Sequence, residues 1–239
     1  MSGTRFSPIR PVSYRDQVVE QVRTAIIEGR LKPNDHITEM ELTAQLGVSR
    51  TPVREALILL QSEGLILLTP HRGAFVRAFD EKAVEEIFSS RVTLENFAAE
   101  LVIGKLDERD FQHLTDLTEQ LRAAMNARNF NHIRSTDMAF HQYLIECTGH
   151  SWLIRSWHEL VAQIAALLYI RAEGLEYDER RAIHDHYVII EALKSGDLNA
   201  VTTAHRQINQ RVATEITAAM RSLKTKGSEP VVAPTPPQG

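Results

Sequence analysis

GVSRTPVREAL, residues 47–57, has the composition of a short amphipathic helix with a basic first turn. The helix is expected to begin near Ser49 or Thr51, and a proline is tolerated in the first turn that follows. Its apolar residues recur at helical spacing and predict a buried face made of Val53, Ala56, Leu57 and Leu60. Arg50 and Arg54 lie four residues apart, so they share one side of the exposed end of this helix.

The segments around this helix predict a winged helix-turn-helix. Three helices are expected, at about 14–28, from a capping box at 38–41 to Gly47, and from about Ser49 to Gly64. Two strands follow at 65–69 and 74–79, with a turn at 70–73 between them. Because the second and third helices are joined by only a few residues, they have the spacing of a helix-turn-helix. This domain is expected to occupy residues 1–78.

The first turn of the third helix offers the chemistry of DNA recognition. A guanidinium of Arg50 or Arg54 can bond both O6 and N7 of guanine, while Ser49 and Thr51 can donate hydroxyls to phosphate. The expected turn between the strands adds a wing tip with His71, Arg72 and Gly73. Arginines on a helix are more often a solvated face, but the capped helix, the short turn and the hairpin together favour DNA binding.

From Asp80 onward the pattern predicts an all-helical domain over residues 79–226. Six or seven helices are expected, and aspartates at their starts are plausible N-caps: Asp80, Asp107, Asp178 and Asp197. Glycines mark the expected ends: Gly104, Gly149, Gly174 and Gly196. The fold class is therefore mainly α, a winged helix-turn-helix followed by a helical bundle. The Pro-rich residues 227–239 are expected to form a disordered tail.

The charge of the chain is unevenly distributed. The net charge is −4, but residues 1–77 hold 10 Lys and Arg against 8 Asp and Glu, whereas the remainder holds 17 against 23. A mildly basic first third can meet phosphates, whereas an acidic remainder is repelled by DNA.

The remaining composition is that expected of a cytoplasmic protein. A single cysteine, Cys147, fits a reducing compartment. The N-terminus has no apolar core of a secretory signal, and the run at 160–170 is too short to span a bilayer, so no membrane partner is expected.

Ionisable residues interrupt the apolar stripes of several helices in the second domain. Asp137 and His141 lie four apart on one stripe, and His186 and His205 each lie on another. A lone histidine on an apolar face is usually a satisfied core residue, but a carboxylate and three imidazoles from three helices can converge. Such ligands suit Zn, Ni, Mn or Fe and leave open positions for an anion. Arg91, on the first stripe, is then expected to hold an effector carboxylate.

The motifs resemble a known family of bacterial regulators. GVSRTPVREAL, with IIEGRLKPNDHITEMEL before it and EGL and HRGAFV after it, resembles the GntR superfamily, with Asn34 where glycine is more usual. RVTLE at 91–95, DMAFH at 137–141 and HYVIIEALKSGD at 186–197 resemble the FCD ligand-binding domain of FadR-type members. The resemblance implies that the first turn and the wing contact operator DNA. It also implies that one Asp and three His bind a divalent metal.

The fourth metal ligand does not match that pattern cleanly. The family places its last histidine eleven residues after the aspartate that is Asp197 here, and this position is Ile208. His205 lies three residues earlier on the same helical face. Two alternatives remain open: His205 binds the metal by a shifted geometry, or the site has three protein ligands.

The expected function is a transcription regulator, usually a repressor, controlled by a small organic acid or related metabolite. A homodimer is expected, because one winged helix contacts few bases and two would read a palindrome in double-stranded operator DNA. The alternative is a helical metalloenzyme with a DNA-binding appendage. Di-iron bundles need Glu-x-x-His pairs, and this cluster is poor in carboxylates, so an enzyme is not expected. An architectural DNA binder would leave the buried polar cluster without a purpose.

Overall fold

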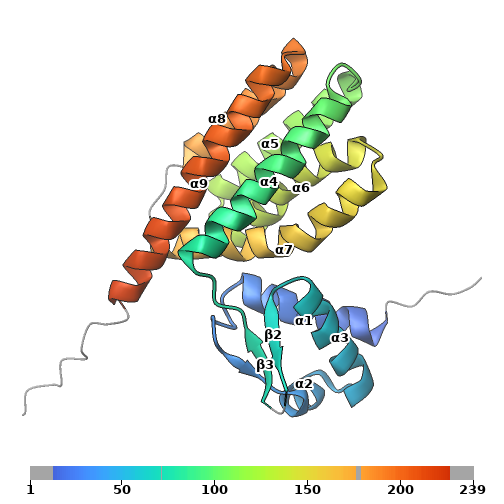
Figure 1. The fold of residues 1–239 in the computed structure, drawn as a ribbon, viewed down its shortest axis with the longest axis vertical. Helices are drawn as coiled ribbons and strands as arrows, with labels where there is room; N and C mark the ends of the chain where they lie inside the picture. The colour runs from blue at the N-terminus through green and yellow to red at the C-terminus, as the bar shows by residue number, and fades with distance from the viewer. Residues whose placement is uncertain (1–12, 71, 176–178, 227–239) are drawn as a thin grey trace, which may run out of the picture. The chain divides into compact units, whose positions relative to one another are not determined.

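The computed structural model describes residues 13–70, 72–175 and 179–226, which form two compact units (Figure 1). The first unit takes in the described residues up to Asp80 together with His150–Ala166. The second takes in Glu81–Gly149 and the described residues from Leu167 onward. The fold class predicted from the sequence, mainly α with a winged helix-turn-helix followed by a helical bundle, is confirmed.

The described residues of the first unit form three complete helices, the first part of α7 (Ser151–Gly174) and a three-stranded sheet. Besides α7, its elements are α1 (Tyr14–Ile27), β1 (His36–Ile37), α2 (Glu39–Leu46), α3 (Arg50–Ser62), β2 (Ile66–Thr69) and β3 (Gly73–Val76). The sheet order is β1-β3-β2 and both pairs are antiparallel. The apolar face predicted for α3 lies in the core, with Val53, Ala56, Leu57 and Leu60 all buried. The core therefore fixes α3 with its opposite face outward.

The helix ends follow the local chemistry of the sequence. The Thr38 side chain accepts from the backbone N–H of Glu41, and the Glu41 carboxylate accepts from that of Thr38, so the predicted capping box is confirmed. Gly47 ends α2 with φ 65°, a left-handed conformation that costs glycine little. Asn34 also has a positive φ, 71°, at the position where the family more often has glycine. Asparagine tolerates this region, so the departure does not change the turn.

The short strand β1 was not expected from the sequence. His36 and Ile37 pair with Phe75 and Ala74 of β3, and the His36 ring stacks on Phe75 with centroids 4.7 Å apart. Two residues are too few to show a period-two pattern. The strand exists because β3 offers it a free edge.

The second unit is wholly helical in its described part. Its helices are α4 (Glu81–Val102), α5 (Glu108–Asn126), α6 (Phe130–Cys147), the end of α7 (Ser151–Gly174), α8 (Glu179–Ser195) and α9 (Leu198–Lys226). The six helices α4 to α9 agree with the six or seven expected after Asp80. A buried apolar cluster from α4, α5, α6, α8 and α9 holds this unit together. No helix in the described ranges combines the length and apolar content needed to cross a bilayer.

Most of the N-cap aspartates and helix-ending glycines expected in this unit are confirmed. Asp107 caps α5, and the Asp197 carboxylate accepts from the backbone N–H groups of Asn199 and Ala200. Three of the four glycines have positive φ: Gly104, Gly149 and Gly196. Gly174 differs, because a Cβ there would lie 2.5 Å from Cβ of Ala219, so it permits a close helix approach. Asp178 and the expected tail at 227–239 lie outside the described residues.

Candidate nucleic-acid interface and metal centre

The first turn of α3 presents polar side chains to solvent. Ser49 is the N-cap residue, but its side chain makes no capping hydrogen bond. Its hydroxyl is therefore available for another acceptor, such as a phosphate. Arg50, Thr51 and Arg54 are also exposed. Because helix N-termini favour anions and the arginines can read guanine, this turn has the chemistry of a DNA-reading surface.

The wing is a tight turn between β2 and β3. The backbone N–H of Arg72 donates to the carbonyl of Thr69 at 3.0 Å, and the Arg72 side chain is exposed. Gly73 follows with φ 90°, and a Cβ there would lie 2.6 Å from Nε2 of His36. Both the backbone conformation and the packing therefore call for glycine at this position. His71, the third predicted wing residue, lies outside the described residues.

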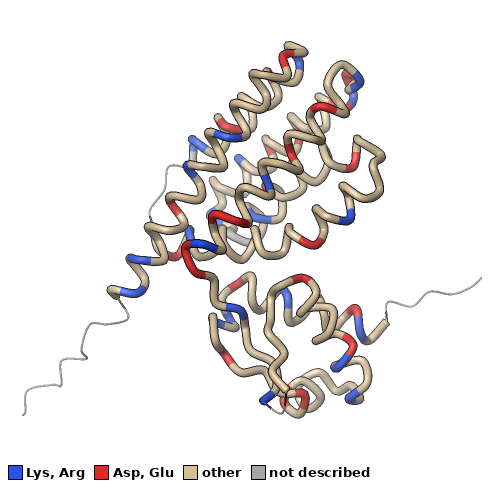
Figure 2. The backbone as a smooth tube through the Cα atoms, in the orientation of Figure 1, with Lys and Arg blue, Asp and Glu red and all other residues tan. Residues whose placement is uncertain are grey.

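An acidic residue of α2 pairs with one of the two arginines that are predicted to contact DNA. Nε of Arg54 donates to Oε1 and Oε2 of Glu39, each at 2.8 Å. Cationic and anionic residues alternate across both units, without a broad field of one sign (Figure 2). A broad positive surface is therefore not available to attract DNA phosphates. Contacts made by individual side chains must contribute more to DNA binding.

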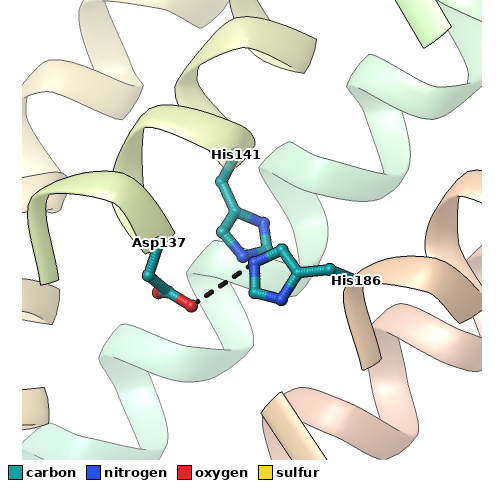
Figure 3. Close-up of side chains that lie close together, drawn as sticks. All are labelled: Asp137, His141 and His186. Carbon is teal, nitrogen blue, oxygen red and sulfur yellow. Dashed lines mark ion pairs between the residues drawn. The ribbon is translucent and has the colours of Figure 1, made fainter. Parts of the chain in front are cut away.

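Three of the four predicted metal ligands converge in the second unit. Asp137 and His141 project from α6 and His186 projects from α8 (Figure 3). One ligand atom from each lies within 4.8 Å of the others. Both imidazoles are buried, whereas the Asp137 side chain is 20% exposed. The two imidazoles are therefore shielded from solvent, whereas solvent reaches the Asp137 carboxylate.

The hydrogen bonds of the two imidazoles direct Nε2 lone pairs into this group. Nδ1 of His186 lies 2.7 Å from the carbonyl oxygen of Ala182, to which it donates its proton. Its Nε2 is then an acceptor, yet it lies 3.4 Å from Oδ1 of Asp137 and makes no hydrogen bond. A cation between the imidazole nitrogen and the carboxylate oxygen would satisfy both of these acceptors. The donor set therefore fits a divalent metal.

Glu95 of α4 fixes the second imidazole. Its Oε1 lies 2.9 Å from Nδ1 of His141, which leaves Nε2 of that ring unprotonated. Burial raises the pKa of the Glu95 carboxyl, but Arg91 and His141 outweigh burial and hold that pKa well below its usual range. Burial and the nearby Arg91 lower the pKa of His141 to about 4. A charged carboxylate thus orients a neutral imidazole, as metal-binding histidines require.

Arg91 and His205 lie outside the group of three. Nε of Arg91 donates to Oε1 of Glu95 at 2.8 Å, and both side chains are buried. The Arg91 guanidinium, which was expected to hold an effector carboxylate, is therefore already paired with the carboxylate of Glu95. Nδ1 of His205 lies 3.0 Å from Oδ1 of Asn96, and its Nε2 makes no hydrogen bond. Ile208, at the family's fourth ligand position, packs against the apolar cluster of the unit.

Three polar residues of this region had no predicted role. Glu95 was visible only as a carboxylate one turn after Arg91, and its contact with His141 spans 46 positions of sequence that periodicity cannot bridge. Asn209 donates from Nδ2 to Oε2 of Glu95 at 2.8 Å. Arg134 is buried one turn before Asp137, with its guanidinium over the ring of Tyr169. Its spacing from Asp137 was the available signal, but nothing marked it as buried.

Comparison with known proteins decides the family. The model of the FCD domain matches residues 86–211, and that of the bacterial regulatory proteins of the gntR family matches residues 14–76. The chain belongs to the GntR family. The FCD match covers most of α4, all of α5 to α8 and the first half of α9, including the three candidate metal ligands.

Relatives and a solved structure agree with this membership. The GntR-family chain is 31% identical over 186 residues to the gluconate operon transcriptional repressor of Bacillus licheniformis, which covers 76% of each chain. It is 30% identical to the HTH-type regulator YdhC of Bacillus subtilis, over 82% of this chain and 87% of that one. The structure of McbR/YncC from E. coli matches with a TM-score of 0.75 and 26% identity, over 86% and 98% of the two chains.

These findings settle the class of function. GntR-family proteins with an FCD domain are transcription regulators that bind operator DNA and small-molecule effectors, and the gluconate relative is named a repressor. The chain is a regulator of this class and not an enzyme, so the alternative of a metalloenzyme falls.

Proposed function

We propose that this regulator represses by reading a palindromic operator with the first turn of α3, and that a small carboxylate in the FCD domain relieves the repression. The supporting observation is the exposed set Ser49, Arg50, Thr51 and Arg54 on a helix whose other face is locked in the core. Such a turn enters the major groove, while the wing with Arg72 and Gly73 approaches the neighbouring backbone or minor groove.

A divalent metal, Zn, Ni, Mn or Fe, is proposed at Asp137, His141 and His186. The support is the pair of acceptors, Nε2 of His186 and Oδ1 of Asp137, that face each other at 3.4 Å. A bound ion would supply positive charge and open coordination positions for an oxyanion. Gluconate is the first carboxylate to test, because relatives are named for a gluconate operon.

The regulator is proposed to act as a homodimer in the cytoplasm. One winged helix contacts too few bases for selective binding, whereas a two-fold dimer reads both halves of a palindrome. Sedimentation should show a dimer at micromolar concentration. A monomer that stays a monomer on its selected DNA would contradict this.

The proposal is tested by selecting duplexes from a random library with the purified full-length protein. The expected result is a palindromic sequence, bound more weakly when gluconate or a related hydroxy acid is added to metal-loaded protein. His141→Ala should keep DNA binding and lose the effect of the acid. A library that yields no enriched sequence would refute the DNA-reading part. A response to the acid that survives His141→Ala would refute the metal part.

A further inference from the structure

Glu39 and Arg54 form an ion pair between the two helices of the helix-turn-helix. Glu39 lies in the first turn of α2, and Arg54 lies four residues after Arg50 on the same side of the N-terminal end of α3. Nε of Arg54 donates to both carboxylate oxygens, each at 2.8 Å. The two side chains remain 36% and 61% exposed, so the pair sits on the surface that carries the reading residues.

Stability does not explain this pair well. Exposed ion pairs contribute little to stability, because water and salt screen them and ordering both side chains costs entropy. The capping box already completes the start of α2 through Thr38 and Glu41. Glu39 therefore has little to add to the fold at this position.

The geometry instead suits the reading of a base. A guanidinium has five N–H donors, and the pair uses only the one on Nε. The two terminal nitrogens form the fork that bonds O6 and N7 of guanine. A free arginine side chain samples many rotamers, and the contact with Glu39 restricts that of Arg54 before DNA arrives.

The charge of Glu39 works against general DNA affinity. A carboxylate beside the reading turn repels phosphates, because DNA carries about one negative charge per 1.7 Å of its axis. A residue that lowers affinity for every DNA sequence has a functional benefit at this position only if it raises the selectivity among sequences.

We propose that Glu39 is a positioning residue that orients Arg54 for one base pair and so raises selectivity at the expense of non-specific affinity. The inference rests on the proposed function, in which the first turn of α3 reads DNA. It assigns to α2 an indirect part in specificity, since Glu39 acts through the position of the Arg54 side chain.

Glu39→Ala and a matched control, Glu41→Gln, separate positioning from charge. Glu41→Gln removes one negative charge from the same helix turn, and glutamine can still complete a capping box with Thr38. The full-length wild type, both variants and Arg54→Ala are each taken through random-duplex selection, followed by anisotropy on the selected and a scrambled duplex.

Glu39→Ala should lose about tenfold in preference at one base pair, within the range of a single bidentate contact, while the rest of the selected sequence is kept. Its affinity for the scrambled duplex should rise, and that of Glu41→Gln should rise equally. Arg54→Ala should lose preference at the same base pair. Glu39→Ala added to Arg54→Ala should then change selectivity no further, because the two residues act as a unit.

Three results would overturn the inference while leaving the proposed function intact. The first is that Glu39→Ala selects the same sequence as the wild type. The second is that Glu41→Gln loses as much preference at that base pair as Glu39→Ala does. The third is that Glu39→Ala causes a further, additive loss of preference when it is combined with Arg54→Ala. A wild type that enriches no sequence refutes the proposed function itself, and the role of Glu39 falls with it.

Discussion

At the scale of single residues, histidines with the same sequence signature differ in what their rings contact. His141 and His205 both lie on apolar stripes and both are buried. Nδ1 of His141 faces the charged Glu95, whereas Nδ1 of His205 faces the neutral amide of Asn96. Periodicity predicted that both rings are buried. It could not predict their partners, because these come from another helix 46 and 109 positions away.

These contacts predict different metal binding by the two histidines. His141→Ala should bind no stoichiometric metal, because it removes one of the three convergent ligands. His205→Ala should keep the metal, because His205 lies outside the group of three. Elemental analysis after metal-replete purification measures both, with circular dichroism as the control for folding. Loss of metal from His205→Ala would instead make it the fourth ligand.

A second prediction at this scale concerns Arg91. Its pair with Glu95 is buried, and removing one partner from a buried ion pair costs about 3–5 kcal/mol, because the other charge is left uncompensated. Arg91→Met should therefore lower the free energy of unfolding by about 3 kcal/mol in urea denaturation. Arg91→Met with Glu95→Leu should cost less than the sum of the two single changes. If Arg91→Met were instead as stable as the wild type but did not respond to the effector, the original expectation that Arg91 binds the effector carboxylate would be supported.

At the scale of elements, the local sequence predicted most helices. It did not predict the features that depend on contacts between residues far apart in the chain. The capping box at Thr38 and the caps at Asp107 and Asp197 could be seen because cap and helix are neighbours in sequence. The strand β1 could not, since its two residues become a strand only beside Phe75 and Ala74. Gly174 was expected to end a helix and does end α7, but nothing in the sequence indicated that it also lets α7 approach Ala219.

Two glycines of the first unit should respond differently to alanine. Gly47 has φ 65° with nothing within 4 Å of an added Cβ, so Gly47→Ala should cost only the left-handed strain, about 1–2 kcal/mol. Gly73→Ala should cost more, because its Cβ also meets His36. Gly47→Asn is the control and should cost less than Gly47→Ala, since asparagine tolerates this conformation. Urea unfolding measures all three, and equal losses at the two glycines would contradict the packing argument.

At the scale of the whole molecule, the sequence predicted two parts but not how α7 is divided between them. Its apolar run at 160–170 was recognised as too short to span a bilayer. Residues 150–166 belong to the first unit, and the rest of α7 belongs to the second. Periodicity identifies an apolar face but does not identify what covers it. The net charge of −4 was similarly uninformative, because the residues proposed to contact DNA are a few exposed side chains of the first unit.

The global stability should depend on pH through the buried His205. Burial and the nearby Arg91 outweigh the attraction of Glu95 and lower the pKa of this imidazole below its usual 6.5, so the folded state keeps it neutral where the unfolded chain is protonated. The unfolded state then binds more protons, and stability falls as pH drops below about 6.5, by up to about 1.4 kcal/mol per pH unit. Urea unfolding of the chelated protein at pH 7.5 and 5.5 should show a smaller loss for His205→Gln than for the wild type. Because every other titrating group is common to both proteins, the difference between them isolates His205, and equal losses would mean that its imidazole is protonated in the folded state.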